Sequence, residues 1–353
     1  MPRELKFFQA LNEAVDVCMA KDPSVYIVGL GVPDPKGIFG STVGLLKKYG
    51  PSRVLDMPTS ENGMTGIAIG SALVGMRPIM THQRIDFALL AIEQIVNQAA
   101  KWHYMFGGQM KVPLVIRMII GRGWGQGPQH SQSLQAWFAH IPGLKVVMPT
   151  TPYDAKGLLI ASIEDNNPVI FLEHRWLYNV TGPVPEGVYR VALGQARIVK
   201  EGSDITIAAI SYMTLEALRA AEILSKEGIK AEVVDIRTLR PFDDTLILDS
   251  IRRTGRLIVA DTGGTTCGFG AEVVARVAEQ ALNELKAPPQ RIGLPDCPTP
   301  TTPALAKRYY PRAIDIVKAA RKTLGLTEAD DSALHTASSV PLDIPDMSFS
   351  GPF

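Results

Sequence analysis

The sequence lacks the features that mark secreted, membrane-spanning and nucleic-acid-binding proteins. Its three cysteines, Cys18, Cys267 and Cys297, are too far apart for a disulfide framework or a zinc site, which favours a reducing compartment. Lys and Arg number 36 against 35 Asp and Glu, so no general charge attracts nucleic acid or an anionic membrane. The chain has no signal-peptide run and no stretch near the roughly 20 apolar residues of a membrane span. We therefore expect a cytoplasmic protein that binds neither nucleic acid nor membrane.

The residues that are present predict a large folded core. Apolar residues make up 46 % of a chain of 353, a length typical of two domains. Short, almost wholly apolar strands alternate with helical patterns in the first half, as in a parallel sheet covered on both faces. These strands are expected at 25–29, 78–81, 113–120, 144–149 and 168–173, and helices at 5–20 and 86–105. The fold class is therefore α/β, with a doubly wound, mostly parallel sheet.

A polar crossover rich in proline and glycine, at 183–187, separates the first series of alternating strands and helices from a second series. Strands are expected again at 204–210, 231–235 and 256–261, with helices between them. The sequence thus predicts a first domain over 1–185, a smaller α/β domain over 186–326, and an extended tail over 327–353 without a core of its own.

The stretch from Asp56 to Gly66 places one carboxylate, Glu61, at the start of a helix of small and apolar residues. Ser60 can cap this helix, and its glycines permit close packing. A carboxylate that leads directly into core-like residues is drawn out of solvent, which suits a group that shares or moves a proton. An ordinary capping acid at a helix start is the alternative interpretation.

A second candidate stretch, residues 121–132, is a glycine-rich loop that ends in Gln129-His130-Ser131-Gln132. It follows a predicted buried strand, where open α/β sheets place their ligand sites. Glycines let a backbone approach a ligand closely. His130 is therefore either a site residue or a surface residue of the loop.

From about residue 5 to 326, the chain resembles the beta subunit of thiamine-diphosphate-dependent 2-oxo-acid dehydrogenases, of the pyruvate and branched-chain type. This decarboxylase component belongs to the transketolase-like superfamily. Each matching motif is weak alone, but six in the family's order are specific. The motifs are Ser60-Glu61-Asn62-Gly63, residues 92–101, residues 129–132, residues 142–147, residues 154–159 and Leu239-Arg240-Pro241-Phe242-Asp243.

The resemblance implies roles for particular residues. Glu61 would hydrogen-bond the pyrimidine nitrogen N1′ of thiamine diphosphate, Phe87 would pack on the pyrimidine, and Gln83 would meet the cofactor ring. His130 would face the substrate, where it could stabilise an oxyanion or pass a proton. Taken alone, Phe87 would be an ordinary core residue.

Some relatives hold a potassium ion near the segment that matches Asp165-Asn166-Asn167. The resemblance therefore implies a potassium site at Asp165 and Asn167. An ordinary turn at a helix end is the alternative interpretation.

One family motif is absent, because the chain has no Gly-Asp-Gly, which opens the site for the diphosphate and Mg²⁺. In two-subunit members that motif lies on the alpha subunit. The resemblance thus implies that this chain holds only the pyrimidine half of the site. An alpha chain would carry the Mg²⁺ ligands, and the active form would be an α₂β₂ heterotetramer.

The chain departs from the family's usual sequence at two places. Gly29-Leu30-Gly31 stands where the family has Gly-Glu-Asp or Gly-Glu-Glu, and Thr81-His82-Gln83-Arg84 where it has Glu-Phe-Met. The second change suits a hydroxylated or anionic acceptor, or else a contact with the alpha subunit.

Three functions stay open. The chain could belong to a dehydrogenase that decarboxylates a 2-oxo acid such as pyruvate and passes the acyl unit to the lipoyl group of an acyltransferase. It could instead belong to a transketolase-like carboligase with a sugar or other carbonyl acceptor. The third alternative is a non-catalytic regulatory subunit. Glu61, Phe87 and His130 are all present, which favours an enzyme.

Overall fold

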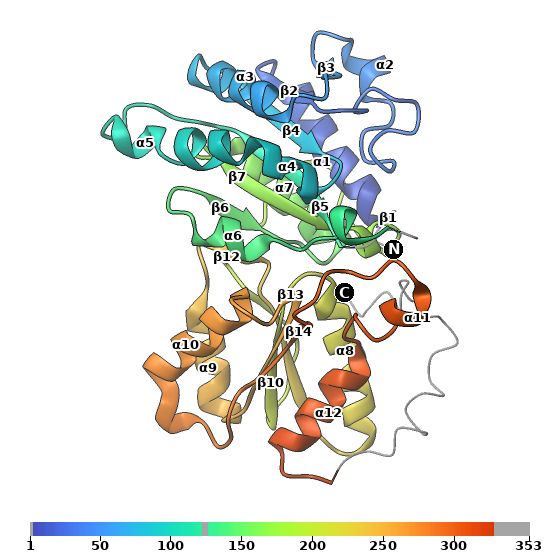
Figure 1. Ribbon diagram of the computed structural model, residues 1–353, viewed down its shortest axis with the longest axis vertical. Coiled ribbons are helices and arrows are strands. Elements are labelled where there is room, and N and C mark those ends of the chain that lie inside the picture. The colour runs from blue at the N-terminus through green and yellow to red at the C-terminus, as the bar shows by residue number, and fades with distance from the viewer. Residues whose placement is uncertain (1–2, 122–125, 328–353) are drawn as a thin grey trace. The chain divides into compact units, whose positions relative to one another are not determined.

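The computed structural model describes residues 3–121 and 126–327, which form two compact units (Figure 1). Within these residues the first unit comprises 3–120 and 137–193, and the second comprises 121, 126–136 and 194–327. The predicted boundary at 185/186 stays a prediction, and all but one residue of the predicted tail lies outside the described part. No helix among the described residues is long and apolar enough to cross a membrane.

The first unit is built on a parallel sheet with the strand order β6-β7-β5-β4-β2-β3. Its strands are β2 (Val25–Val28), β3 (Val54–Leu55), β4 (Arg77–His82), β5 (Val115–Ile120), β6 (Lys145–Val147) and β7 (Val169–His174). Every residue of β5 and β7 is buried, as a sheet covered on both faces requires. The predicted doubly wound, mostly parallel fold is confirmed.

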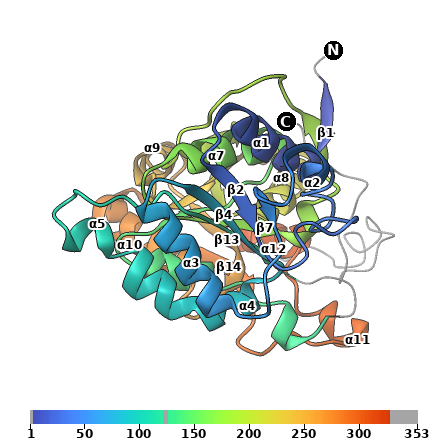
Figure 2. The same ribbon diagram turned by 90° about the horizontal axis from the view of Figure 1, so that it is seen from above.

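Helices cover both faces of this sheet (Figure 2). α1 (Phe7–Lys21) and α7 (Pro152–Glu164) pack together on one face, and α3 (Glu61–Leu73) packs against β4 on the other. The remaining elements of the unit are short. They are β1 (Glu4–Lys6), α2 (Leu45–Tyr49), α4 (Ile85–Ala88), η1 (Leu89–Ala91), η2 (Gln94–Ala99), α5 (Trp102–Met105), η4 (Arg175–Leu177) and β8 (Thr181–Pro183).

An ion pair is buried between two adjacent strands of this sheet, β5 and β7. Arg117 on β5 donates from Nε to Glu173 Oε1 on β7 at 2.6 Å, and Tyr178 donates to the second carboxylate oxygen. Both charged side chains are 1 % exposed. Such a pair adds little net stability, but the loss of either partner would leave a buried charge without compensation.

Three local predictions are wrong in detail. The helix expected at 86–105 is divided into α4, η1, the π-helix η2 and α5, and Leu90 in η1 is 64 % exposed. The first helix begins at Phe7 because residues 4–6 pair as β1 with the distant β8. Ser60 is the N-cap of α3, but its side chain makes no capping hydrogen bond.

The second unit has a sheet with the order β14-β13-β10-β11-β9, in which β9 is antiparallel to β11 and the other pairs are parallel. α8 and α12 cover one face, and α9 and α10 cover the other (Figure 1). The strands of this sheet are β9 (Arg197–Lys200), β10 (Ile205–Ala209), β11 (Ala231–Asp235), β13 (Leu257–Gly264) and β14 (Gln290–Leu294), and the unit also contains β12 (Thr238–Arg240), which is not part of the sheet. Its helices are η3 (Pro128–His130), α8 (Tyr212–Lys226), α9 (Asp244–Thr254), α10 (Phe269–Ala281), η5 (Leu282–Glu284), α11 (Pro303–Ala306) and α12 (Ala313–Thr323). α6 (Gln135–His140) begins in this unit.

Candidate active site

Glu61 begins α3 on the side of the helix that faces the core. The buried residues of α3 are Glu61, Thr65, Ala68, Ile69 and Ala72, and their spacing of three or four forms one stripe. The Glu61 side chain is therefore only 5 % exposed, although it is the first residue of the helix. In the described part of the chain, no side chain pairs with its carboxylate. A semi-buried acid in this position can hold a ligand's polar atom.

The loops after three neighbouring strands, β3, β2 and β4, are tied together at the carboxyl edge of the sheet. Asp56 Oδ1 accepts hydrogen bonds from the backbone amides of Gly31, at 3.0 Å, and Met57, at 2.9 Å. Gln83 Nε2 donates to the carbonyl of Leu30 at 2.8 Å. These bonds fix the backbone that leads to Glu61, and they orient Gln83, the predicted ring contact.

Buried polar atoms without a hydrogen-bond partner gather at this edge. They include Thr81 Oγ1 and His82 Nε2 on β4 and Thr65 Oγ1 on α3. His82 is 2 % exposed, and burial lowers its pKa to about 4, so its imidazole is neutral at pH 7. Burying polar atoms unpaired is costly, which makes this edge suited to a polar ligand such as an aminopyrimidine. From the sequence, His82 had no individual role, and it stood out only as part of the departure at residues 81–84.

Cationic and aromatic side chains lie beyond the end of β4. Arg84 is 3 % exposed, and its guanidinium lies 5.9 Å from the ring centre of Phe39. Arg175 lies 4.4 Å from the same ring. Burial lowers the pKa of His174 to about 3, with a further contribution from the charge of Arg84. Phe87, on α4, is half-buried, as a ring that presents one face to a ligand would be.

His130, the second predicted catalytic residue, is the last residue of η3 and is exposed. By its contacts, its segment belongs to the second unit, whereas Glu61, Gln83 and Phe87 belong to the first. Four residues of the predicted glycine-rich loop, 122–125, lie outside the described residues.

The predicted potassium site has its oxygens engaged by cationic side chains. Asp165 Oδ2 pairs with Lys145. Arg77 donates to the carbonyls of Ile163 and Asp165 and to the side chain of Asn166. Asp165 Oδ1 accepts from the backbone amide of Asn167 at 2.8 Å. This arrangement favours the alternative interpretation, a turn closed by an aspartate side chain.

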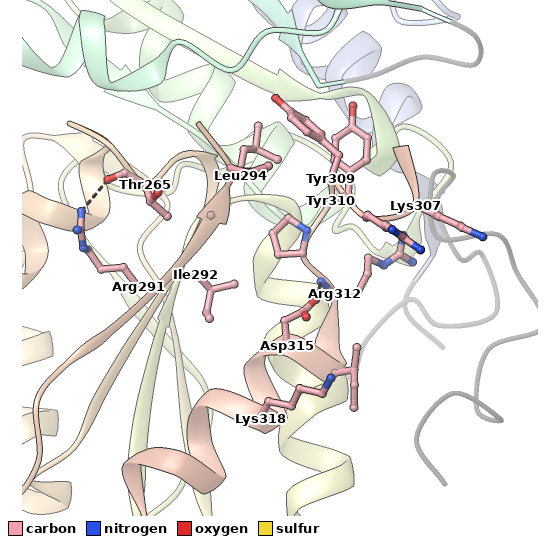
Figure 3. A pocket seen from close by; sticks show the side chains of 15 residues that line it. Thr265, Arg291, Ile292, Leu294, Lys307, Tyr309, Tyr310, Arg312, Asp315 and Lys318 are labelled. Carbon is pink, nitrogen blue, oxygen red and sulfur yellow. Dashed lines mark hydrogen bonds between the residues drawn. The ribbon is translucent and has the colours of Figure 1, made fainter. Parts of the chain in front are cut away.

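The second unit has a cavity of about 870 Å³ between β14 and the start of α12 (Figure 3). Arg291, Lys307, Arg308, Arg312 and Lys318 line it, with Asp315 as the one acid among its lining residues. Arg291 donates to the Thr265 carbonyl at 2.6 Å. None of the predicted site residues lies in this cavity.

The first unit thus carries a nearly buried acid at the carboxyl edge of a parallel sheet, and the second is a smaller α/β unit. This combination defines the class of transketolase-like proteins. The chain belongs to that family, since residues 3–181 match the transketolase pyrimidine binding domain and residues 194–316 the transketolase C-terminal domain.

Similarity to known proteins places the chain in a smaller group within this family. It is 47 % identical to the acetoin:2,6-dichlorophenolindophenol oxidoreductase subunit beta of Cupriavidus necator, over 92 % of this chain and 98 % of that protein. It is 44 % identical to a mitochondrial pyruvate dehydrogenase E1 component subunit beta-2 of Oryza sativa, over 91 % and 86 %. A solved structure titled "Split gene transketolase, inactive beta4 tetramer" aligns with a TM-score of 0.74 and 27 % identity, over 91 % and 99 %. The resemblance to 2-oxo-acid dehydrogenase beta subunits is therefore confirmed.

Proposed function

We propose that this chain is the beta subunit of a heteromeric enzyme that uses thiamine diphosphate to decarboxylate a 2-oxo acid of about the size of pyruvate. The observation that carries the proposal is Glu61, a nearly buried carboxylate at the start of α3, on a sheet edge that also carries buried unpartnered polar atoms at the end of β4. The beta subunits of pyruvate dehydrogenase and of the acetoin oxidoreductase support it.

When bound, thiamine diphosphate supplies the carbanion stabilisation that decarboxylation of a 2-oxo acid needs. The residues of this chain fit the pyrimidine end of that cofactor. Glu61 holds and shares a proton at pyrimidine N1′, which its position out of solvent favours. Gln83, fixed by Leu30, and the half-buried ring of Phe87 orient the pyrimidine. His130 acts on the substrate as a proton donor or an oxyanion partner.

A partner chain completes the site in this proposal. The sequence has no Gly-Asp-Gly motif, so the alpha chain supplies the Mg²⁺ and diphosphate ligands, in an α₂β₂ assembly. The split transketolase whose beta-only tetramer is titled inactive supports this division of labour.

Substitution of Glu61 by Gln in the assembly tests the proposal. Because glutamine cannot share a proton with N1′, we expect the rate of CO₂ release from pyruvate to fall by a factor of about 10² or more. Glu201→Gln, which changes an exposed acid of the second unit, is the matched control and should leave the rate unchanged. Full activity of Glu61→Gln would contradict the proposal and favour a non-catalytic regulatory subunit.

The fate of the acyl unit separates two versions of the function. Transfer to a lipoyl group of an acyltransferase is the version that the dehydrogenase relatives favour. The polar end of β4, with His82 and the buried Arg84, favours instead a carboligase that uses a sugar or another carbonyl acceptor. Product analysis with lipoylated protein and with sugar acceptors distinguishes them, because only the carboligase forms a new carbon–carbon bond.

A further inference from the structure

The segment that carries His130 belongs, by its contacts, to the second unit. The backbone amide of Gly121 donates to the carbonyl of Gln132 at 3.4 Å, which closes the base of the loop. His130 itself is exposed, so its own side chain is not held by burial. The anchoring of residues 126–136 therefore contributes to its position.

One anchor is a hydrogen bond between Gln135 and Asp261. Gln135, the first residue of α6, is 1 % exposed, and its Nε2 donates to Asp261 Oδ1 at 2.7 Å. Asp261 is 4 % exposed and lies on β13, the strand between β10 and β14. The backbone amide of Gly263 donates to the same carboxylate oxygen at 3.1 Å. The same carboxylate oxygen is thus held by β13 itself and by the side chain of Gln135.

The backbone around this bond is shaped to admit the Gln135 side chain. A Cβ on Gly263 would lie 2.5 Å from Gln135 Nε2, so only glycine leaves room for the amide at this place. At the other end of the segment, a Cβ on Gly127 would lie 2.6 Å from Thr301 Oγ1. Close approaches to the second unit therefore flank His130 on both sides.

The Asp261 carboxylate is held by hydrogen bonds and not by a cation. No Lys or Arg of the described residues forms an ion pair with it. Burial raises the pKa of Asp261, and hydrogen bonds from Gln135 and from backbone amides offset part of that effect. A buried carboxyl group without a cation costs stability. An apolar residue in its place would leave the amides of Gln135 and Gly263 without this acceptor.

We propose that Asp261 and Gln135 are positioning residues, which hold the segment 126–136 on the second unit and thereby place His130 for the reaction. This inference rests on the proposed function of His130. It gives the C-terminal unit a direct part in the chemistry, through a carboxylate that touches neither cofactor nor substrate.

Removing either group tests the proposal in the assembled enzyme. Asp261→Ala removes the acceptor, and Gln135→Ala removes the donor. Each should lower kcat for CO₂ release by about 10- to 100-fold, because small displacements of a catalytic group cost that much. The apparent affinity for thiamine diphosphate should stay within about twofold, since the pyrimidine site lies in the first unit. The conservative variant Asp261→Asn keeps an Oδ1 that can accept from Gln135 Nε2 and from the Gly263 amide, and it should retain most of kcat.

A matched control variant and a second measurement distinguish a loss of positioning from a loss of stability. Glu232→Gln changes another buried acid of the same unit, which pairs with Arg253 and lies on β11. It should lower the melting temperature without the kcat loss expected of Asp261→Ala and Gln135→Ala. Hydrogen exchange of the amides in 126–136 should accelerate in Asp261→Ala and Gln135→Ala but not in Glu232→Gln.

Because exchange does not depend on turnover, it tests the anchor even where the proposed reaction fails. Unchanged exchange in Asp261→Ala and Gln135→Ala would overturn the inference. Accelerated exchange with wild-type kcat would also overturn it, since His130 would then need no positioning. Failure of the proposed function would appear separately, as full activity of Glu61→Gln.

Discussion

At the candidate site, burial moves the pKa of one side chain, His82, far from its ordinary value. It is 2 % exposed at the end of β4, its Nε2 has no hydrogen-bond partner, and burial lowers its pKa to about 4 from an ordinary value of 6.5. The folded protein therefore keeps this imidazole neutral at a pH where the unfolded chain binds a proton. Stability that depends on the neutral form is lost as the pH falls below 6.5.

We predict that His82→Gln makes stability less dependent on pH. Between pH 7 and 5, His82 binds a proton in the unfolded chain but not in the folded one, which lowers the free energy of unfolding of the wild type by about 2 kcal/mol. The free energy of unfolding of the variant should fall by that much less over the same interval, measured by chemical denaturation at both pH values. His140→Gln, at an exposed position, is the control and should retain the wild-type pH dependence. An unchanged pH dependence in His82→Gln would show that the imidazole is not buried.

At the residue scale, the sequence predicted that Glu61 would be drawn out of solvent, but it did not single out the other polar residues of this sheet edge. The prediction rested on an acid that leads directly into small and apolar residues, and the structure places Glu61 on the buried stripe of α3. His82, by contrast, is one histidine at the end of a strand, and no local pattern tells whether its nitrogen has a partner. The same holds for Gln135 and Asp261, which are 126 residues apart in the sequence.

At the element scale, some short motifs are explained by close contacts between segments that are distant in the sequence. Gly143 packs directly against the helical run of residues 92–101, since a Cβ at Gly143 would lie 1.9 Å from the carbonyl oxygen of Ala100. Lys101 donates to the carbonyl of Pro142 at 2.8 Å beside it. The π-helix η2 lies in the first of these segments. Periodicity alone could not predict it, because its i→i+5 bonds leave no mark in the spacing of apolar residues.

We predict that Gly143→Ala destabilises the protein far more than Gly75→Ala. Both glycines have a left-handed backbone, with φ of +98° and +100°, but nothing lies within 4 Å of a Cβ on Gly75. Gly75→Ala should therefore cost only the backbone strain of about 1–2 kcal/mol. Gly143→Ala adds a collision with backbone and should cost about 3 kcal/mol or more. Equal free energies of unfolding for the two variants would contradict the close approach.

At the scale of the whole molecule, the parallel strands and the second α/β unit could be predicted, because strands that are buried on both faces have continuous apolar sequences. The return of residues 126–136 to the second unit could not, since it depends on contacts with β13 and on the residues after β14. The missing Gly-Asp-Gly motif is also a property of the whole chain. It is the basis of the proposal that this chain needs an alpha subunit to complete the site.

Turnover of pyruvate by this chain alone and with its alpha subunit is the most direct test of the account. Both preparations would receive thiamine diphosphate and Mg²⁺, and CO₂ release would be measured at equal beta-chain concentration. We predict no release above background from the lone chain, and sustained release from the pair that Glu61→Gln abolishes. Full turnover by the lone chain would contradict the account, because this chain would then hold the whole site.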